Sequence, residues 1–252
     1  MNERRVEPGE TRGPRLSVAA PCFNEAEGIA DVIKEWDGAL DGLAYTSEIV
    51  ICNDGSTDAT GEILKSLEGR YARLRVVELD TNSGYGRALS RAVRATCGEY
   101  VATIDSDGQF DLADVAPLMA VMEQGDCELV TGYRYRKHDA PARVLANRAL
   151  NLLVTLMFGV RLRDSNCALK LAQGKVLRDL NIEASSWAAP TEICLRVHAR
   201  GQRIREVSVG HRDRMLGTSK MRTVSVAWGF FRYLVYMRVK LHLYRAGILR
   251  QP

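Results

Sequence analysis

The sequence predicts an α/β protein, in which a mostly parallel central sheet is flanked by helices and followed by C-terminal amphipathic helices. Short β-rich runs alternate with segments of helical periodicity from residue 16 to residue 134. Polar clusters follow several of these runs, at the strand ends where open parallel sheets bind ligands. Apolar and basic residues are interleaved over residues 223–245, as in an amphipathic helix.

Five runs are candidate strands of the sheet. They are Leu16–Ala20, Glu48–Cys52, Leu74–Leu79, Tyr100–Ile104 and Glu128–Thr131. Between the first two runs, apolar residues recur at intervals of three and four, as on one face of a helix: Ile29, Val32, Ile33, Trp36 and Leu40. This alternation of strand and helix predicts parallel strands joined by helices.

The pattern changes after residue 134. It predicts a long apolar helix over residues 142–160, the start of a strand over 164–170, a helix over 190–200 and a strand over 204–209. We divide the chain into a disordered tail (1–15), a catalytic domain (16–221) and amphipathic helices (222–252) that pack on the domain or lie at a membrane interface.

The composition is that of an ordinary soluble globular protein, with 252 residues, 46% hydrophobic and 26% charged. The net charge of +4 is mild, but arginine and lysine are dense from residue 196 to residue 250 and indicate an anionic partner such as phosphate or a membrane surface. Six cysteines without a Cys-x-x-Cys pair predict buried thiols in a reducing compartment. No secretory signal or apolar run of roughly 20 residues is present, so we expect a cytoplasmic protein.

The segment from Asp105 to Gln109 is the clearest candidate for chemistry. It follows the buried run that ends at Ile104. Because alternate residues of an extended chain point the same way, Asp105, Asp107 and Gln109 can present oxygen atoms to one small volume beyond the sheet. Such a group suits a hard divalent ion together with a diphosphate.

Three further polar clusters follow other candidate strands, at residues 21–25, 53–58 and 80–86. Each could be an ordinary turn with a helix cap. Four clusters at the same edge of one sheet favour a ligand site.

Taken together, these segments resemble the family 2 glycosyltransferases of GT-A fold, most closely the polyprenyl (dolichyl) phosphate mannose and glucose synthases. The resemblance extends from residue 16 to about residue 221. The matching segments, in chain order, are residues 20–25, 53–60, 82–88, 105–109, 132–134, 164–170, Glu192 and residues 214–220.

The resemblance implies a site for a nucleotide-sugar donor, a GDP- or UDP-hexose. Pro21, Asn24, Glu25 and Asp54 would hold its nucleoside, and Asp105 would lie near the ribose or base.

Asp107 and Gln109 match metal-binding positions of the family, with Mg²⁺ or Mn²⁺ bridging the donor diphosphate. The metal would neutralise the charge that develops on the leaving nucleoside diphosphate, so Asp107 counts among the catalytic residues.

The resemblance also implies cationic groups around the phosphates. Arg134 would contact the donor diphosphate or the acceptor phosphate, and Arg143 would assist at the acceptor. Arg214, Ser219 and Lys220 match a segment that closes over the site; Arg214 and Lys220 are expected to be catalytic, and Ser219 to contact the acceptor phosphate.

The implied reaction is an inverting transfer of a hexose, such as mannose, to a polyprenyl phosphate. A phosphate acceptor is already anionic near neutral pH, so it needs cations near the nucleophile more than a general base. We expect peripheral association with the cytoplasmic face of a membrane, no nucleic-acid partner, and a homo-oligomer or membrane-anchoring subunit as further partners. Four cations within residues 223–245 argue against a spanning helix.

Two other functions remain open. One is a soluble glycosyltransferase that acts on a hydroxyl of a polysaccharide or secondary metabolite, with Glu192 or Asp164 as the base. The other is a non-catalytic nucleotide-sugar-binding partner. The chain also departs from the family pattern: Asn53 replaces the usual first Asp of the Asp-Asp-Gly-Ser run, Asn166-Cys167 replaces Thr or Ser and Gly, and Ser208 replaces Pro.

Overall fold

The computed structural model describes residues 13–135, 141–212 and 223–250. Arg214, Ser219 and Lys220 therefore lie outside the described residues, as does most of the expected N-terminal tail.

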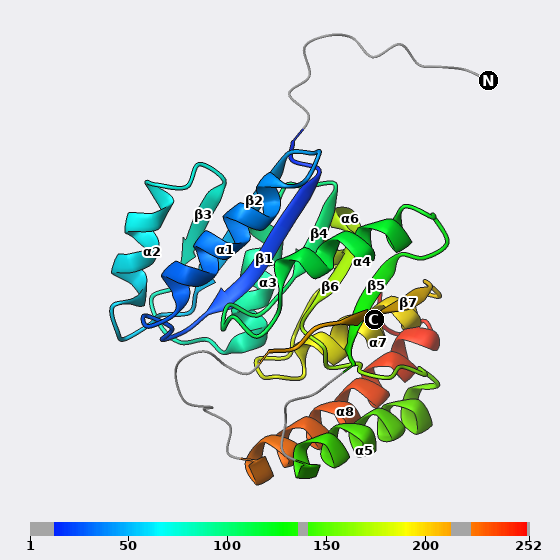
Figure 1. The fold of residues 1–252 in the computed structure, drawn as a ribbon. Coiled ribbons are helices and arrows are strands. Elements are labelled where there is room, and N and C mark those ends of the chain that lie inside the picture. The colour runs from blue at the N-terminus through cyan, green and yellow to red at the C-terminus, as the bar shows by residue number, and fades with distance from the viewer. Residues whose placement is uncertain (1–12, 136–140, 213–222, 251–252) are drawn as a thin grey trace, which may run out of the picture.

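The described part of the chain forms one seven-stranded sheet with helices on both faces (Figure 1). The strands are β1 (Leu16–Cys22), β2 (Ser47–Asn53), β3 (Leu74–Glu78), β4 (Tyr100–Thr103), β5 (Leu129–Arg134), β6 (Lys170–Gln173) and β7 (Ile204–Val209). The α-helices are α1 (Ile29–Asp41), α2 (Thr60–Glu68), α3 (Tyr85–Ala95), α4 (Val115–Met122), α5 (Pro141–Phe158), α6 (Gly174–Arg178), α7 (Ala189–Ala199) and α8 (Thr223–Arg245). A short 3₁₀ helix, η1 (Leu112–Asp114), precedes α4.

The strand order is β3-β2-β1-β4-β6-β5-β7, and the sheet is mostly parallel, as the sequence predicts. The exception is β6, which is antiparallel to both β4 and β5. The predicted strand start at residues 164–170 was placed too early, since residues 164–169 form a loop and β6 begins at Lys170. Every residue of β1 is buried, as expected for a central strand covered on both faces.

Two apolar layers enclose the sheet. On one face, α1, α2 and α4 cover it with residues that include the predicted α1 set. On the other face lie α3, α6 and α7, with α5 and α8 completing the layer. Five of the six cysteines are buried, whereas Cys97 is exposed, so the prediction of buried thiols is wrong at that one position.

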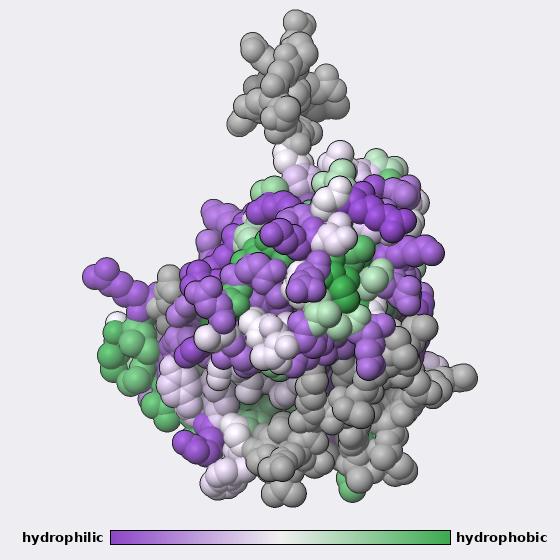
Figure 2. All heavy atoms as spheres, turned by 90° about the vertical axis from the view of Figure 1, so that its left-hand side faces the viewer, coloured by the Kyte–Doolittle hydropathy of each residue, from purple (hydrophilic) through white to green (hydrophobic). Residues whose placement is uncertain are grey.

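The long helices α5 and α8 lie side by side at one end of the molecule (Figure 1). Helix α8 packs on the body through Phe230, Leu234, Met237 and Leu241. Among the described residues, no helix combines the length and the apolarity that a bilayer crossing requires. The side of the molecule shown in Figure 2 is mainly hydrophilic where it is described, with hydrophobic residues in smaller groups.

Candidate active site

The polar clusters that follow β1, β2 and β4 meet at one edge of the sheet. The backbone N–H of Asp54 donates to the carbonyl of Cys22 at 2.8 Å, which joins the ends of β1 and β2. The hydroxyl of Ser106 donates to the carbonyl of Pro21 at 2.7 Å, which joins the segment after β4 to the end of β1. The structure therefore brings together the segments that the sequence predicts to form the donor site.

Asn24 connects the first two clusters. It is the described non-glycine residue with a positive φ, 53°, a conformation that Asn tolerates better than most residues. Its backbone N–H donates to Ser56 Oγ at 2.9 Å, and its side-chain oxygen accepts from the N–H of Thr57 at 2.8 Å. The N–H of Glu25 donates to Thr60 Oγ1 at 2.9 Å. These bonds hold Asn24 and Glu25 against the turn that follows β2.

Asp54 holds the polar cluster at residues 80–86, which follows β3. Asp54 is 2% exposed, and its carboxylate accepts three hydrogen bonds: from the N–H of Ser83 at 2.7 Å, the hydroxyl of Ser83 at 2.8 Å and the N–H of Gly84 at 2.9 Å. Asp54 therefore fixes the turn that leads into α3. The predicted contact between Asp54 and the nucleoside stays a prediction.

Asp105 is held by a tyrosine that the sequence analysis did not single out. The Tyr85 hydroxyl, at the start of α3, donates to Asp105 Oδ1 at 2.7 Å. Burial, and then the neighbouring negative charge of Asp105, raise the pKa of Tyr85 well above its ordinary value, so the phenol stays neutral and remains a donor. Tyr85 stacks on Trp187, with ring centroids 4.9 Å apart and planes at 25°.

The loop that carries Trp187 lies directly on the turn at residues 84–86. A Cβ added at Gly84 would lie 2.2 Å from the carbonyl oxygen of Ser185, and one at Gly86 would lie 1.8 Å from that of Ala184. Only residues without a side chain permit this approach. These two glycines therefore allow residues 183–188 to bring Trp187 onto Tyr85.

Glu192 supports the loop of residues 183–188. Its carboxylate is 0% exposed and accepts hydrogen bonds from the backbone N–H groups of Glu183 at 2.9 and 3.2 Å and of Ala184 at 2.8 Å. It also forms an ion pair with Arg196 at 2.5 Å. A carboxylate that is enclosed and bonded in this way supports the loop, which argues against the base role considered for Glu192.

Asp107 and Gln109 lie in a tight turn after β4. Gly108 has φ 73°, and Asp107 Oδ1 accepts from the N–H of Gln109 at 3.1 Å. The Gln109 side chain donates through its nitrogen to the carbonyl of Arg212 at 3.2 Å. The amide oxygen of Gln109 is then the atom that it can offer to a cation.

The side-chain oxygens of Asp107 and Gln109 fit a hard divalent ion. The Asp107 carboxylate and the Gln109 amide oxygen are the ligand types that Mg²⁺ and Mn²⁺ prefer. Within the described residues, no three His, Cys, Asp or Glu side chains converge as a metal cage. An ion held here would therefore take further ligands from a bound diphosphate or water, as Mg²⁺ usually does.

Arg212 fixes the chain just before residues 213–222. Its N–H donates to the carbonyl of Gln109 at 2.8 Å. Its guanidinium bonds Glu35 at 2.9 Å and also pairs with Asp111. Arg212 thus lies beside the candidate metal-binding turn, and Arg214, Ser219 and Lys220 follow it in the sequence, outside the described residues.

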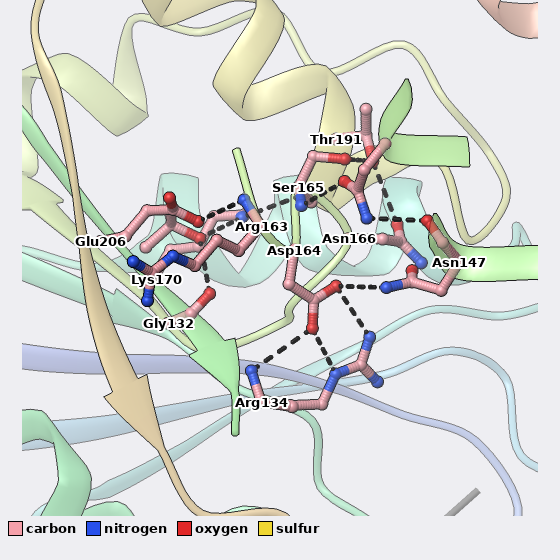
Figure 3. A network of polar contacts seen from close by, with 12 residues as sticks. Gly132, Arg134, Asn147, Arg163, Asp164, Ser165, Asn166, Lys170, Thr191 and Glu206 are labelled. Atoms are coloured by element: carbon pink, nitrogen blue, oxygen red, sulfur yellow. Dashed lines mark hydrogen bonds and ion pairs between the residues drawn. The ribbon is translucent and has the colours of Figure 1, made fainter. Parts of the chain in front are cut away.

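Arg134, at the end of β5, forms a bidentate ion pair with Asp164 (Figure 3). The N–O distances are 2.7 and 3.1 Å, and the Asp164 side chain is only 2% exposed. Asn147, from α5, donates to the same carboxylate at 3.3 Å. The Asp164 carboxylate is therefore paired and enclosed, which argues against the base role considered for it.

The loop before β6 is anchored by a buried lysine (Figure 3). Lys170 is 0% exposed, and its ammonium donates to Thr131 Oγ1 at 2.7 Å and to the carbonyl of Ser165 at 3.1 Å. The N–H of Ser165 donates to Asn151 of α5 at 2.9 Å. These contacts position Asp164 opposite Arg134. Arg143 lies in the first turn of α5, and its predicted contact with the acceptor phosphate stays a prediction.

The fold and this edge of polar residues define a glycosyltransferase of the GT-A type. Residues 17–177 match the sequence model described as Glycosyl transferase family 2, and the chain belongs to that family.

Relatives and solved structures agree with this assignment. The chain is 28% identical over 236 residues to a dodecaprenyl-phosphate galacturonate synthase of Rhizobium johnstonii, covering 89% of this chain and 68% of that protein. It is 31% identical over 216 residues to glycosyltransferase AglD of Haloferax volcanii, covering 82% of this chain but only 34% of that protein. It is 25% identical over 231 residues to an undecaprenyl-phosphate 4-deoxy-4-formamido-L-arabinose transferase of Salmonella paratyphi A, covering 90% and 69%.

The fold is shared with glucosyl-3-phosphoglycerate synthase of Mycobacterium tuberculosis. Its complex with Mn²⁺, uridine diphosphate and phosphoglyceric acid matches with a TM-score of 0.67 and 22% identity, over 97% of this chain and 85% of that one. At this identity the comparison establishes the fold.

Proposed function

We propose that this protein transfers a hexose from a nucleotide diphosphate sugar, GDP- or UDP-linked, to a polyprenyl phosphate, with inversion at the anomeric carbon. The observation that carries the proposal is the state of the two carboxylates considered as bases: Glu192 is paired with Arg196, and Asp164 with Arg134. A hydroxyl acceptor would need a base, whereas a phosphate acceptor is itself anionic. The names of two relatives, a dodecaprenyl-phosphate and an undecaprenyl-phosphate sugar transferase, support the same acceptor class.

The donor would lie along the edge formed by the ends of β1, β2 and β4. Asn24, Glu25 and Asp54 border the nucleoside side of this edge, and Asp105 is held for the donor by Tyr85. Asp107 and Gln109 would hold Mg²⁺ or Mn²⁺, which supplies positive charge to the leaving nucleoside diphosphate.

The acceptor side is built by β5, the loop before β6 and α5. Asp164 holds the Arg134 guanidinium in one orientation at the end of β5 and balances its charge. In the proposed reaction Arg134 donates hydrogen bonds to the phosphates, and Arg143, Arg214, Ser219 and Lys220 supply the cationic environment as the sequence predicts.

We further propose that the enzyme binds a membrane surface through α5 and α8. Two apolar stripes point away from the core: Leu145, Leu152 and Leu156 on α5, and Trp228, Phe231, Val235 and Val239 on α8. Trp228 and Phe231 stack at 5.7 Å. Exposed Arg232 and Arg238 flank the stripe on α8, an arrangement that suits a helix lying among anionic headgroups. This peripheral location would bring the site to its lipid acceptor.

The test is transfer of radiolabel from a panel of GDP- and UDP-hexoses to an organic-extractable product. Undecaprenyl phosphate in vesicles is the acceptor, with Mg²⁺ or Mn²⁺ added. We expect a product with the phosphate and none with undecaprenol, which lacks it. Asp107→Ala should abolish transfer, and Glu62→Ala, an exposed change on α2, should not. Transfer to a water-soluble hydroxyl acceptor, with none to the lipid phosphate, would refute the proposal.

A further inference from the structure

A second cationic site lies at the opposite edge of the sheet. A cavity of about 730 Å³, the arginine pocket, is lined by Arg94, Arg178, Asp179, Asn181, Arg200, Tyr244 and Arg250. Arg94 is in the last turn of α3, and Arg200 caps the C-terminus of α7. Both helices begin at the active site, where Tyr85 stacks on Trp187. Each has 11 residues, so the pocket lies about 16 Å, one helix length, from that stack.

Three of the four guanidinium groups of the pocket are oriented by neutral partners. Arg178 donates to the carbonyl of Gly98 at 3.1 Å, and Arg200 to the carbonyl of Asp179 at 3.0 Å. Arg94 donates to the side-chain oxygen of Asn181 at 3.3 Å. Among the described carboxylates, none forms an ion pair with an arginine of this pocket.

The charge balance of the lining is therefore strongly positive. Four arginines face one cavity, and Asp179 is the one carboxylate in the lining. Cations at helix C-termini complement the helix dipole, which accounts for Arg94 and Arg200 separately. The dipole does not explain why Arg250, beyond the end of α8, faces the same cavity. Several planar guanidinium groups around one space are suited to bidentate binding of phosphate oxygens.

We propose that the arginine pocket binds a phosphate-bearing anion, either the headgroup of an anionic lipid or a soluble phosphate compound. This site is separate from the donor site and does not depend on the proposed transfer reaction. Its position beside the C-terminal end of α8 places it at the end of the helix that carries the exposed apolar stripe. An anion bound there would connect α3, α6, α7 and α8.

The first test is calorimetric titration of the purified full chain with inorganic pyrophosphate in EDTA, so that binding through a divalent ion is removed. Arg94→Gln/Arg250→Gln removes two pocket charges. Arg91→Gln/Lys175→Gln removes two exposed charges from α3 and α6 outside the lining, and is the matched control. We expect the pocket variant to bind at least about tenfold more weakly than the control. Equal thermal melting of the two variants verifies that both are folded.

A second arm identifies the source of the anion by flotation with vesicles that contain phosphatidylglycerol. Weaker flotation of the pocket variant than of the control supports a lipid headgroup. Weaker pyrophosphate binding with unchanged flotation supports a soluble phosphate compound. If neither pyrophosphate nor vesicles distinguish the pocket variant from its control, the proposed site does not exist. Neither arm measures sugar transfer, so failure here leaves the proposed function standing.

Discussion

Glu192→Gln should destabilise the protein although it changes almost no volume. Glu192 uses both oxygens as acceptors: Oε1 accepts from Arg196 and from the N–H of Glu183, and Oε2 accepts from the N–H of Ala184. A glutamine has one acceptor oxygen, so its NH₂ group must face one of these donors. The substitution also removes the negative charge that neutralises the buried Arg196.

The size of the effect follows from burial. The Arg196 and Glu192 side chains are 1% and 0% exposed. Breaking such a pair by removing one partner costs about 3–5 kcal/mol. Glu183 lies 3.3 Å from Arg196 and retains part of the attraction, so we expect a loss near the lower limit, about 3 kcal/mol. For a chain of this size that corresponds to a fall in Tm of roughly 6–12 °C.

The assay is urea unfolding of the wild type, Glu192→Gln, Arg196→Met and the double variant Glu192→Gln/Arg196→Met. We expect the double variant to be more stable than the sum of the single losses predicts, since it leaves no unpaired buried charge. The loop of residues 183–188 should loosen in Glu192→Gln, seen as a change in Trp187 fluorescence. A loss below about 1 kcal/mol in Glu192→Gln would refute the buried-pair reasoning.

Three further outcomes are expected. Tyr85→Phe removes a hydrogen bond to a charged carboxylate and should lower kcat/KM for the donor by about tenfold or more, which steady-state kinetics would measure; unchanged kinetics would contradict a donor role for Asp105. Asp107→Ala should abolish metal-dependent transfer, whereas Asp105→Asn should mainly raise the KM of the donor. Burial opposes ionisation of Glu183, but hydrogen bonds from Lys240 and then Tyr236 lower its pKa below the ordinary 4.5. Its contribution to stability is therefore present above pH 4.5 and lost as the pH falls through the lowered pKa. In acid unfolding curves, Lys240→Met should lose less stability than the wild type as the pH falls. Identical acid unfolding of the variant and the wild type would argue against the Glu183–Lys240 pair.

The parts of the site that the sequence predicts are those that lie next to strand ends. Asn24, Asp54 and Asp105 follow β1, β2 and β4 directly, and parallel strands bring their carboxyl ends to one edge. The direction of β6 was not predictable in the same way. The short run at Lys170–Gln173 has no feature that distinguishes parallel from antiparallel pairing.

The contacts that the sequence analysis missed join residues far apart in the chain. Trp187 stacks on Tyr85 across about one hundred positions, and no local pattern marks either residue as a partner of the other. The closest signal was Gly84-Tyr85-Gly86, since paired glycines often mark a close approach of another backbone. The approaching backbone, residues 184–185, could only be identified from the structure.

The departure from the family pattern at Asn53 has a local explanation. Asn53 is 3% exposed, and its side-chain nitrogen donates to a carboxylate oxygen of Glu78, on the neighbouring strand β3, at 2.7 Å. Its side-chain oxygen accepts from the hydroxyl of Ser56 at 2.6 Å. An aspartate here would place two carboxylates within hydrogen-bond distance, which is unfavourable unless one is protonated. Asn53 therefore suits this position because its amide can donate to Glu78. Its side-chain oxygen holds Ser56, whose hydroxyl in turn accepts from the N–H of Asn24. The absence of the usual aspartate thus reflects how this chain supports the donor edge, and it is compatible with the same donor chemistry.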